Sequence, residues 1–418
     1  MSDSNRTRIS YGLESTYGTH PGGALIDLRT TGESLKVDKN TVASQELRAD
    51  RNIPDLLTVG VGSAGDLNFE LSCYTPGSSL LNFDQWWLYL LGATGYSATT
   101  TISSLAYTCT SAGAGTYQGT FVRTGGSDFS ALLDGQWFRM QAGTFTGGST
   151  AANQGWWKVI AHSTTSVAND TITVIGFKDV VAGTIDGAGG SNLATLRQHG
   201  MAVNGTQSNS ITLEKNYQDL SGADAWEIHN GLMIDRLSLS VKNDQIITGS
   251  WGLIGKIGAS AGATGGSSYV LANTNDVLTG VANVVGILEA NKPLAMTEFT
   301  MQIQTNLRPR QVIGTLGNIG VGLGSFVVTG TFKAYFANKT LANKYFNATV
   351  TTLTLAVAEQ PTGVAGNYQI WDMQQVKLSA GQVVATGING DVMMEFSYQA
   401  LLEAAEPVGN YTLRYTRG

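Results

Sequence analysis

The segment GVGSAG at residues 60–65 is the part of the chain whose spacing most resembles a chemical motif. It matches the dinucleotide-binding fingerprint, in which a glycine-rich turn brings the N-terminus of a helix up to a pyrophosphate. The fingerprint requires a helix after the last glycine. Here Leu67, Phe69 and Leu71 alternate with polar residues, which is the period of a strand. We therefore interpret the glycines as a turn between two extended segments and predict no nucleotide site.

The other residues that could do chemistry lack the spacing that a reaction needs. The sequence has no G-x-S-x-G elbow and no P-loop. The carboxylates Asp224 and Glu227 lie in the polar stretch SGADAWEIHNG and are interpreted as solvated loop charges. No histidine has a second ligand at a metal-binding spacing such as H-x-x-x-H. The four histidines are His20, His162, His199 and His229. The sequence therefore predicts a protein that is not an enzyme, with no catalytic residue, no metal and no cofactor.

The composition excludes several further classes of function. The net charge is −6, with 25 Lys and Arg against 31 Asp and Glu, so we do not expect a surface that binds nucleic acid through excess positive charge. No apolar stretch approaches the roughly 20 residues of a membrane helix, and the polar start MSDSNRTRIS has no export signal. Cys73 and Cys109 are the only cysteines in 418 residues, which favours folding in a reducing cytoplasm.

Alternation of apolar and polar residues predicts strands through most of the chain. Gly, Asn and Asp separate these runs, and the pattern indicates a mainly β chain built as an antiparallel sandwich or barrel. The clearest alternating runs are 237–241, 247–253, 299–303, 326–336, 392–398 and 411–415.

One stretch, from Leu80 to Leu91, has the apolar spacing of an amphipathic helix. We expect its apolar stripe to cover the open side of the sheet or, alternatively, to form a contact between subunits, since aromatic residues are enriched in interface cores. The stripe consists of Phe83, Trp86, Trp87 and Leu90. A weaker helix is predicted from Leu341 to Phe346.

A change of composition divides the chain into domains. Residues 102–190 are rich in Thr, Ser and Gly, follow the small-residue linker GATGYS and end in a glycine-rich exit. We interpret 102–190 as a small β domain with strands around 137–139, 156–160 and 171–175. Insertion into an exposed loop of a larger domain is tolerated because few core contacts cross such a site. The larger β domain then consists of residues 1–101 and 191–418.

The order of these features resembles the major tail tube proteins of long-tailed bacteriophages. The first half carries SLKVDKNTVASQELRADR, the strand DLNFELS and the helix FDQWWLYLLG. The second half carries GLMIDRLSLSVKNDQIITGSWGLIGK, the run TMQIQTNLRPRQVIGTLGNIGVGLGSFVVTGTFKAYF and the closing stretch NGDVMMEFSYQALLE. The insert is similar to the additional β domain that many of these proteins carry, with Asn153 in a turn before the strand at Trp156. The resemblance spans nearly the whole chain and rests on the ordered set of motifs.

The resemblance implies a β-sandwich flanked by one helix, closed into hexameric rings whose inner strands form a continuous barrel. It implies that the rings stack on a tape-measure protein into a tube, and that tail-terminator and tail-tip proteins are further partners. The phage DNA then passes through the lumen without sequence-specific binding, and nothing inserts into a membrane. The location implied is the tail of a virion assembled in the host cytoplasm, and a long non-contractile tail is favoured.

Within this picture the polar segment 30–54 is a candidate arm between stacked rings. Its charge cluster could form ion pairs from ring to ring; with equal weight, the same charges could be solvated, where exposed pairs contribute little. The cluster consists of Glu46, Arg48, Asp50 and Arg51.

Two other functions fit the same sequence. A glycan-binding adhesive protein would use exposed aromatic residues, and Trp137, Trp156 and Trp157 of the insert could provide them unless they form the insert's own core. A minor virion protein, such as a decoration or tail-tip component, would not polymerise alone.

Overall fold

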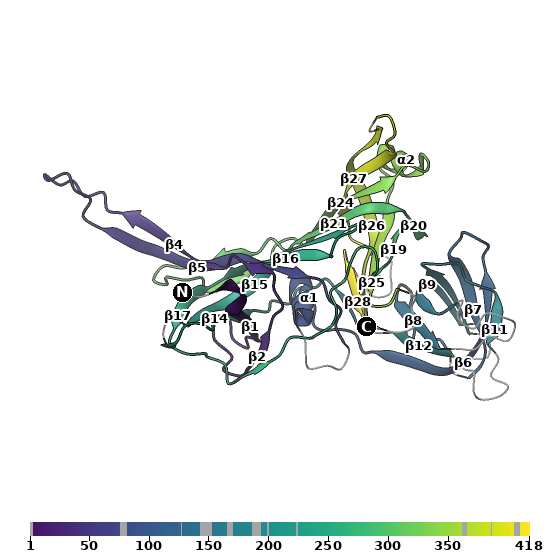
Figure 1. Ribbon diagram of the computed structural model, residues 1–418, viewed down its shortest axis with the longest axis horizontal. Coiled ribbons are helices and arrows are strands. Elements are labelled where there is room, and N and C mark those ends of the chain that lie inside the picture. The colour runs from purple at the N-terminus through teal and green to yellow at the C-terminus, as the bar shows by residue number, and fades with distance from the viewer. Residues whose placement is uncertain are drawn as a thin grey trace.

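The computed structural model describes residues 3–75, 82–126, 128–142, 153–164, 170–185, 194–198, 200–222, 225–361, 366–385, 387–404 and 410–418. The fold of these residues is mainly β, as predicted from the alternation of apolar and polar residues. It consists of a large mixed sheet, a small curled antiparallel sheet and two short α-helices (Figure 1).

The elements follow one another closely along the chain. The helices are α1 (Asp84–Leu91) and α2 (Thr340–Phe346), and the 3-10 turn η1 (Ser4–Arg6) precedes the first strand. The large sheet is formed by β1 (Thr7–Leu13), β2 (Ala24–Asp27), β3 (Gly32–Glu33), β4 (Lys36–Ala43), β5 (Leu56–Glu70), β13 (Met201–Val203), β14 (Ile211–Tyr217), β15 (Trp226–Lys242), β16 (Thr248–Gly255), β17 (Ile257–Ala261), β18 (Ser268–Val270), β19 (Val284–Glu289), β20 (Lys292–Pro293), β21 (Met296–Gln304), β24 (Val327–Tyr335), β25 (Thr351–Ala358), β26 (Tyr368–Ala385), β27 (Val392–Ala400) and β28 (Arg414–Arg417). The small sheet is formed by β6 (Thr100–Ser111), β7 (Gln118–Gly126), β8 (Trp137–Ala142), β9 (Gly155–Thr164), β10 (Asp170–Gly176), β11 (Gly183–Ile185) and β12 (Ala194–Gln198), while β22 (Arg308–Arg310) and β23 (Gly320–Gly322) form a separate hairpin.

The central part of the large sheet is an unbroken antiparallel series, β4–β5–β16–β15–β21–β24–β27–β26. Its register aligns apolar residues across the strands on one face, where they are buried. One such row consists of Leu67, Trp251, Leu237, Ile303 and Val328. The period of two along each strand sends the residues between them to the opposite face.

Helix α1 packs on the apolar face of this series, beneath β15 and β16 in Figure 1. It begins at Asp84, and Gly92 ends it in the left-handed conformation, with φ of 61° and its N–H bonded to the helix carbonyls. The predicted start at Leu80 lies outside the described residues. The weaker helix predicted from Leu341 to Phe346 is confirmed as α2.

The small sheet curls until β6 pairs with both β12 and β7, so that its strands enclose a core of their own. The strands predicted around 137–139, 156–160 and 171–175 are confirmed as β8, β9 and β10. The sheet lies at one end of the molecule, to the right in Figure 1, and continues to Gln198 in β12. The division into domains at residues 102 and 190 stays a prediction.

The glycine-rich segment 60–65 does not form the predicted turn, because it lies inside the 15-residue strand β5. Gly65 is required there by a close approach of main chains. An added Cβ at Gly65 would lie 2.4 Å from Leu35 Cα and 2.6 Å from Ser34 O. A glycine in such a cluster can therefore mark a close approach of neighbouring main chains as well as a turn.

Replacing Gly65 by alanine is expected to lower the free energy of unfolding by about 1–3 kcal/mol, because the new methyl group overpacks against the Leu35 main chain. Gly62→Ala is the matched control in the same strand, since its nearest neighbour would be the Gly255 carbonyl at 4.0 Å. Urea unfolding of both variants checks this, and equal losses would contradict the close-approach explanation.

Candidate assembly surfaces

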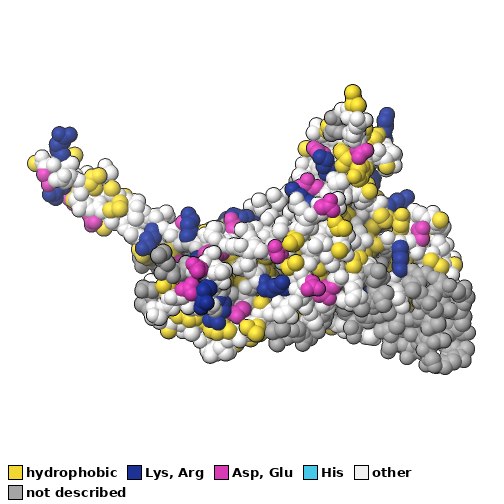
Figure 2. All heavy atoms as spheres, viewed as in Figure 1, with side chains coloured by type: hydrophobic (Ala, Val, Ile, Leu, Met, Phe, Trp, Pro, Cys, Tyr) yellow, Lys and Arg dark blue, Asp and Glu magenta, His cyan; other side chains and the backbone are white. Residues whose placement is uncertain are grey.

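β4 and β5 continue past the sheet as a hairpin arm, defined here as residues 40–60, which projects far from the rest of the molecule (Figure 1). The arm carries apolar side chains in solvent, and Leu47 near its tip is fully exposed. The exposed apolar set is Val42, Leu47, Ile53, Leu56, Leu57 and Val59. Figure 2 shows this apolar surface along the arm with charged side chains at the tip. An exposed apolar surface of this kind marks an interaction site.

The predicted charge cluster lies at the tip of the arm, between β4 and β5. Arg48 donates two hydrogen bonds to the Asp50 carboxylate, from Nε at 3.0 Å and from Nη2 at 2.8 Å. The hydrogen bonds from Arg48 lower the pKa of Asp50 to about 2. Glu46 and Arg51 are exposed beside this pair. Whether these four residues contact another subunit stays a prediction.

The second face of the central series is lined by short polar side chains, and we call it the polar face. Its middle rows consist of Asn68, Ser250, Ser238, Gln302, Thr329 and Gln399, and of Glu70, Thr248, Ser240, Thr300, Thr331 and Ser397. Apart from Glu70, the side chains of these rows are hydroxyl or amide groups, which bind water without net charge, so the rows are hydrophilic and close to neutral.

Three ion pairs lie on the polar face, whose further charged residues include Glu70 and Lys377. Arg236 bonds Asp66 at 2.7 Å, Lys242 bonds Glu298 at 2.8 Å, and Lys333 bonds Glu395 at 2.8 Å. Each pair joins neighbouring strands or strands one apart, so that no block of one sign accumulates. Sequence reasoning missed this face because alternation shows which residues share a side of a strand but not which strands are neighbours.

The four residues predicted on the helix stripe, Phe83, Trp86, Trp87 and Leu90, are all buried in the chain's own core. The Trp86 ring lies edge-on to Trp251 with centroids 5.7 Å apart. The Trp87 ring stacks on Tyr415 at 4.6 Å. In this structure the stripe packs α1 against the sheet of its own chain.

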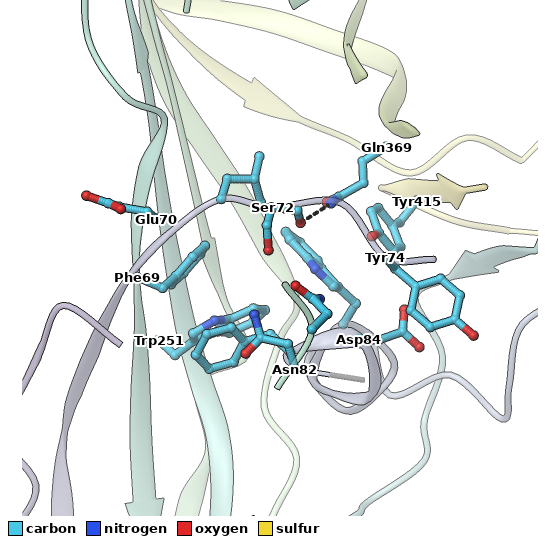
Figure 3. A pocket seen from close by; sticks show the side chains of 13 residues that line it. Phe69, Glu70, Ser72, Tyr74, Asn82, Asp84, Trp251, Gln369 and Tyr415 are labelled. Atoms are coloured by element: carbon cyan, nitrogen blue, oxygen red, sulfur yellow. Dashed lines mark hydrogen bonds between the residues drawn. The ribbon is translucent and has the colours of Figure 1, made fainter. Parts of the chain in front are cut away.

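A pocket beside α1 is too small for a ligand (Figure 3). Phe69, Trp251, Asn82 and Asp84 line it, and Gln369 closes it with a hydrogen bond of 2.8 Å to the Ser72 carbonyl. Its volume is about 20 Å³, the space of a single water molecule, whereas small-molecule sites occupy roughly 300 Å³ or more. Burial raises the pKa of Asp84 to about 7 in spite of its ion pair with Arg417.

Ser63, His229 and Glu227 form the arrangement that most resembles a catalytic triad. The Ser63 hydroxyl lies 2.7 Å from His229 Nδ1, and His229 Nε2 lies 3.0 Å from a Glu227 oxygen, at ion-pair distance without good hydrogen-bond alignment. Ser63 is 2% and His229 0% exposed, so a substrate in solvent does not reach them. The cluster instead ties β5 to β15 beneath the base of the arm.

Glu227 is not the solvated loop charge that the sequence suggested. It lies in β15, and the contact with His229 lowers its pKa to about 2, with Lys215 contributing a further ion pair at 3.5 Å. Asp224 and His199 lie outside the described residues. Within the described part of the chain, no group of His, Cys, Asp and Glu side chains is arranged to hold a metal ion, and no described helix is long and apolar enough to cross a membrane.

A buried charge cluster fastens the small sheet to the large one. Asp372 in β26 accepts a hydrogen bond from Arg414 at 2.7 Å and lies 3.2 Å from the ammonium of Lys158 in β9. Trp137 of β8 also donates to this carboxylate at 3.3 Å. Burial alone would raise the pKa of Asp372, but Lys158 and Arg414 hold it well below its ordinary value. The carboxylate in the apolar run YQIWDMQQV was the one sequence signal that could have revealed this cluster.

The three tryptophans considered as a glycan platform are buried. Trp157 lies in the core of the small sheet, while Trp137 and Trp156 pack against Tyr368 and Ile370 of the large sheet. None presents an open ring to a sugar, so the alternative of an adhesive glycan-binding protein has no support at these residues.

A family model described as "Phage tail tube protein" matches residues 4–400 of the chain. No curated protein matches the chain.

Proposed function

The chain belongs to the phage tail tube protein family. We propose that its copies join into rings with six structurally similar parts, and that these rings stack into the tail tube, the conduit for genome ejection. It is a structural protein of the virion tail and not an enzyme. The arm is the observation that carries the proposal, because an isolated chain leaves its apolar side chains in water. A tube gives these side chains a partner in every ring.

We assign the arm to the joint between stacked rings. Its apolar side chains are buried against the neighbouring ring, and the charges at the tip fix its orientation. Arg48 and Asp50 already pair within the tip. Glu46 and Arg51 then remain to pair across the joint.

We assign the polar face to the wall of the lumen. A channel for DNA must hold water and offer the phosphates no block of positive charge. The paired charges of Arg236, Lys242 and Lys333 with their acids meet this requirement. The tape-measure protein occupies the lumen before ejection, and the terminator and tip proteins bind the two ends of the tube.

Replacing Leu47 and Ile53 together by aspartate is expected to stop the tube from growing while the chain stays folded, since both side chains are exposed on the arm. The purified chain, when concentrated, should form rings and tubes under negative-stain microscopy. The double variant should form no stacks longer than one ring. Leu133→Asp, an exposed apolar position between β7 and β8, is the control and should form normal tubes. Tubes of normal length from the double variant would contradict the assignment of the arm.

Replacing Glu298 by lysine is expected to make the lumen retain DNA. The change breaks the pair with Lys242 and leaves several positive charges together with Lys333 on the polar face. Short duplex DNA should co-sediment with the variant tubes at about 50 mM salt and be released near 200 mM, as counterion release requires. Asp276→Lys, at an exposed loop position, adds the same charge elsewhere. Equal retention by both variants would count against the polar face as the lumen wall.

A further inference from the structure

Twelve of the described strands of the large sheet, together with the two helices, form two sets with the same order along the chain. The first set is β1, β4, β5, α1, β14, β15 and β16, and the second is β19, β21, β24, α2, β25, β26 and β27. The pairings β1–β14, β4–β5, β5–β16, β14–β15 and β15–β16 correspond to β19–β25, β21–β24, β24–β27, β25–β26 and β26–β27. The small sheet is inserted in the first set between α1 and β14.

The two sets also share two register shifts at corresponding positions. A register shift interrupts β14 against β15 at the position where one interrupts β25 against β26, and a second shift interrupts both β15 and β26 further along. The shifts fall at Ile211/Leu213 and Thr351/Leu353, and at Ile234/Arg236 and Leu378/Ala380. β-Bulges are specific features of a fold. The common order, pairing and bulges make the chain a tandem duplication of one structural unit.

Among the described strands of the two sets, one pair joins the first unit directly to the second. The second half of β15, from Arg236 to Lys242, pairs with β21 of the second unit on the edge opposite β16. The corresponding half of β26, from Lys377 to Ala385, has β27 on one edge and no strand of the described residues on the other. The second unit therefore leaves open the strand edge on β26 that corresponds to the edge with which β15 of the first unit pairs with the second unit.

The opposite end of the series has the complementary open edge. β21 pairs with β15 of the first unit. Its counterparts in the first unit, β3 and β4, pair only with β5 among the described strands. Open strand edges are templates for pairing with another chain. Because the two edges differ, pairing them is head to tail and generates a ring if the rotation closes.

We propose that residues 380–385 of one copy pair with residues 33–38 of the next, repeating the internal β15–β21 joint, so that a six-part ring contains three chains. This rests on the proposed tube assembly and revises the six chains per ring that the resemblance implies. Each chain supplies two of the six parts, and internal and external joints alternate around the ring.

The internal joint fixes the register of the external one. Leu239 faces Met301 in the β15–β21 pair, and the equivalent positions place Val383 of one copy opposite Leu35 of the next. Val383 is 42% exposed in the free chain and faces the apolar side of the sheet, where Leu35 is buried. Pairing then covers Val383, and it sets Gln382 opposite Lys36 on the polar face.

The edge at Leu35 is protected in the free chain. Ser34 donates its N–H to Asp66 of β5, so the main-chain groups of Leu35 face outward. The Leu35 N–H donates to Glu33 at 2.7 Å, and its carbonyl accepts from Lys215 at 2.6 Å. These side chains cap the edge until a strand of the next copy replaces them.

Cysteines at Gln382 and Lys36 of the same chain test the pairing, since directly opposed residues have Cβ atoms about 4.5–5.5 Å apart, within reach of a disulfide after small adjustment. Mild oxidation of assembled rings should link neighbouring copies, and the covalent ladder on a denaturing gel should end at three chains. Gln382→Cys with Lys39→Cys is the mismatched control, because Lys39 lies on the other side of the strand. The native Cys73 and Cys109 are buried and free.

The possible results test the three-chain ring, the edge pairing and the tube function separately. A ladder that continues to six chains would overturn the three-chain ring. Normal tubes without cross-links would overturn the edge pairing and leave the tube function standing, whereas a chain that forms no rings at all would overturn both. Native mass spectrometry of isolated rings gives a second reading of three copies of the 44.1 kDa chain.

Discussion

Asp372→Ala is expected to cause a loss of about 3–5 kcal/mol in the free energy of unfolding, because it removes the buried carboxylate that pairs with two buried cations. Asp372 and Arg414 are completely buried, and the Lys158 ammonium lies 3.2 Å from the same carboxylate. The three residues come from β26, β28 and β9, so the variant should also loosen the contact between the two sheets.

The matched control is Glu395→Ala on the same sheet. Its carboxylate is exposed and pairs with exposed Lys333, so solvent compensates most of the loss. Urea unfolding of both variants measures the difference, and protease cleavage of the small sheet reports its release. Similar free energies of unfolding for the two variants would show that the buried cluster does not stabilise the contact between the two sheets.

Acid should remove the same stabilisation in the parent protein. The folded pKa of Asp372 lies below its ordinary value of 3.8, so its contribution is present above that pH and is lost as the pH falls through the folded value. Asp372→Ala should therefore show a flatter loss of stability below about pH 4 than the parent chain.

Val383→Lys is expected to abolish rings and leave a folded monomer. In the free chain this side chain points partly into solvent, at 42% exposure, so lysine is tolerated there. In the ring it would lie against Leu35 of the next copy, where a charge is costly to bury. Lysine on an open strand edge is also a common device against unwanted pairing.

Size-exclusion chromatography with light scattering and circular dichroism check the two halves of this expectation. Ile388→Lys is the control, since Ile388 is 97% exposed in the turn between β26 and β27 and lies beyond the proposed joint. The control should still form rings. Rings of normal mass from Val383→Lys would exclude this edge as the lateral contact.

Several features of the fold were predictable from local sequence. The alternation at Leu67, Phe69 and Leu71 specified a strand with one buried face, and the later runs behaved in the same way. The tryptophan spacing specified α1. The absence of catalytic spacing agreed with a structural family, although the buried Ser63–His229 contact shows that side chains far apart in sequence can still meet.

Other features were decided by contacts that the sequence does not display. The segment 60–65 looked like a turn, but it is part of β5, where Gly65 allows the close approach of the Leu35 main chain. The cluster at Asp372 joins residues 158, 372 and 414, and no local pattern links them.

By itself, then, the sequence determined the mainly β class, the helix stripe and the resemblance to tail tube proteins, because the period of two and the period of 3.6 are local properties of the chain. Only the tertiary structure decided which strands are neighbours, and with them the arm, the polar face and the duplicated unit with its two open edges. The physical reason is that alternation specifies the face of a strand but not its partner. Partners are selected by register, bulges and close main-chain approaches between segments that are far apart in the chain.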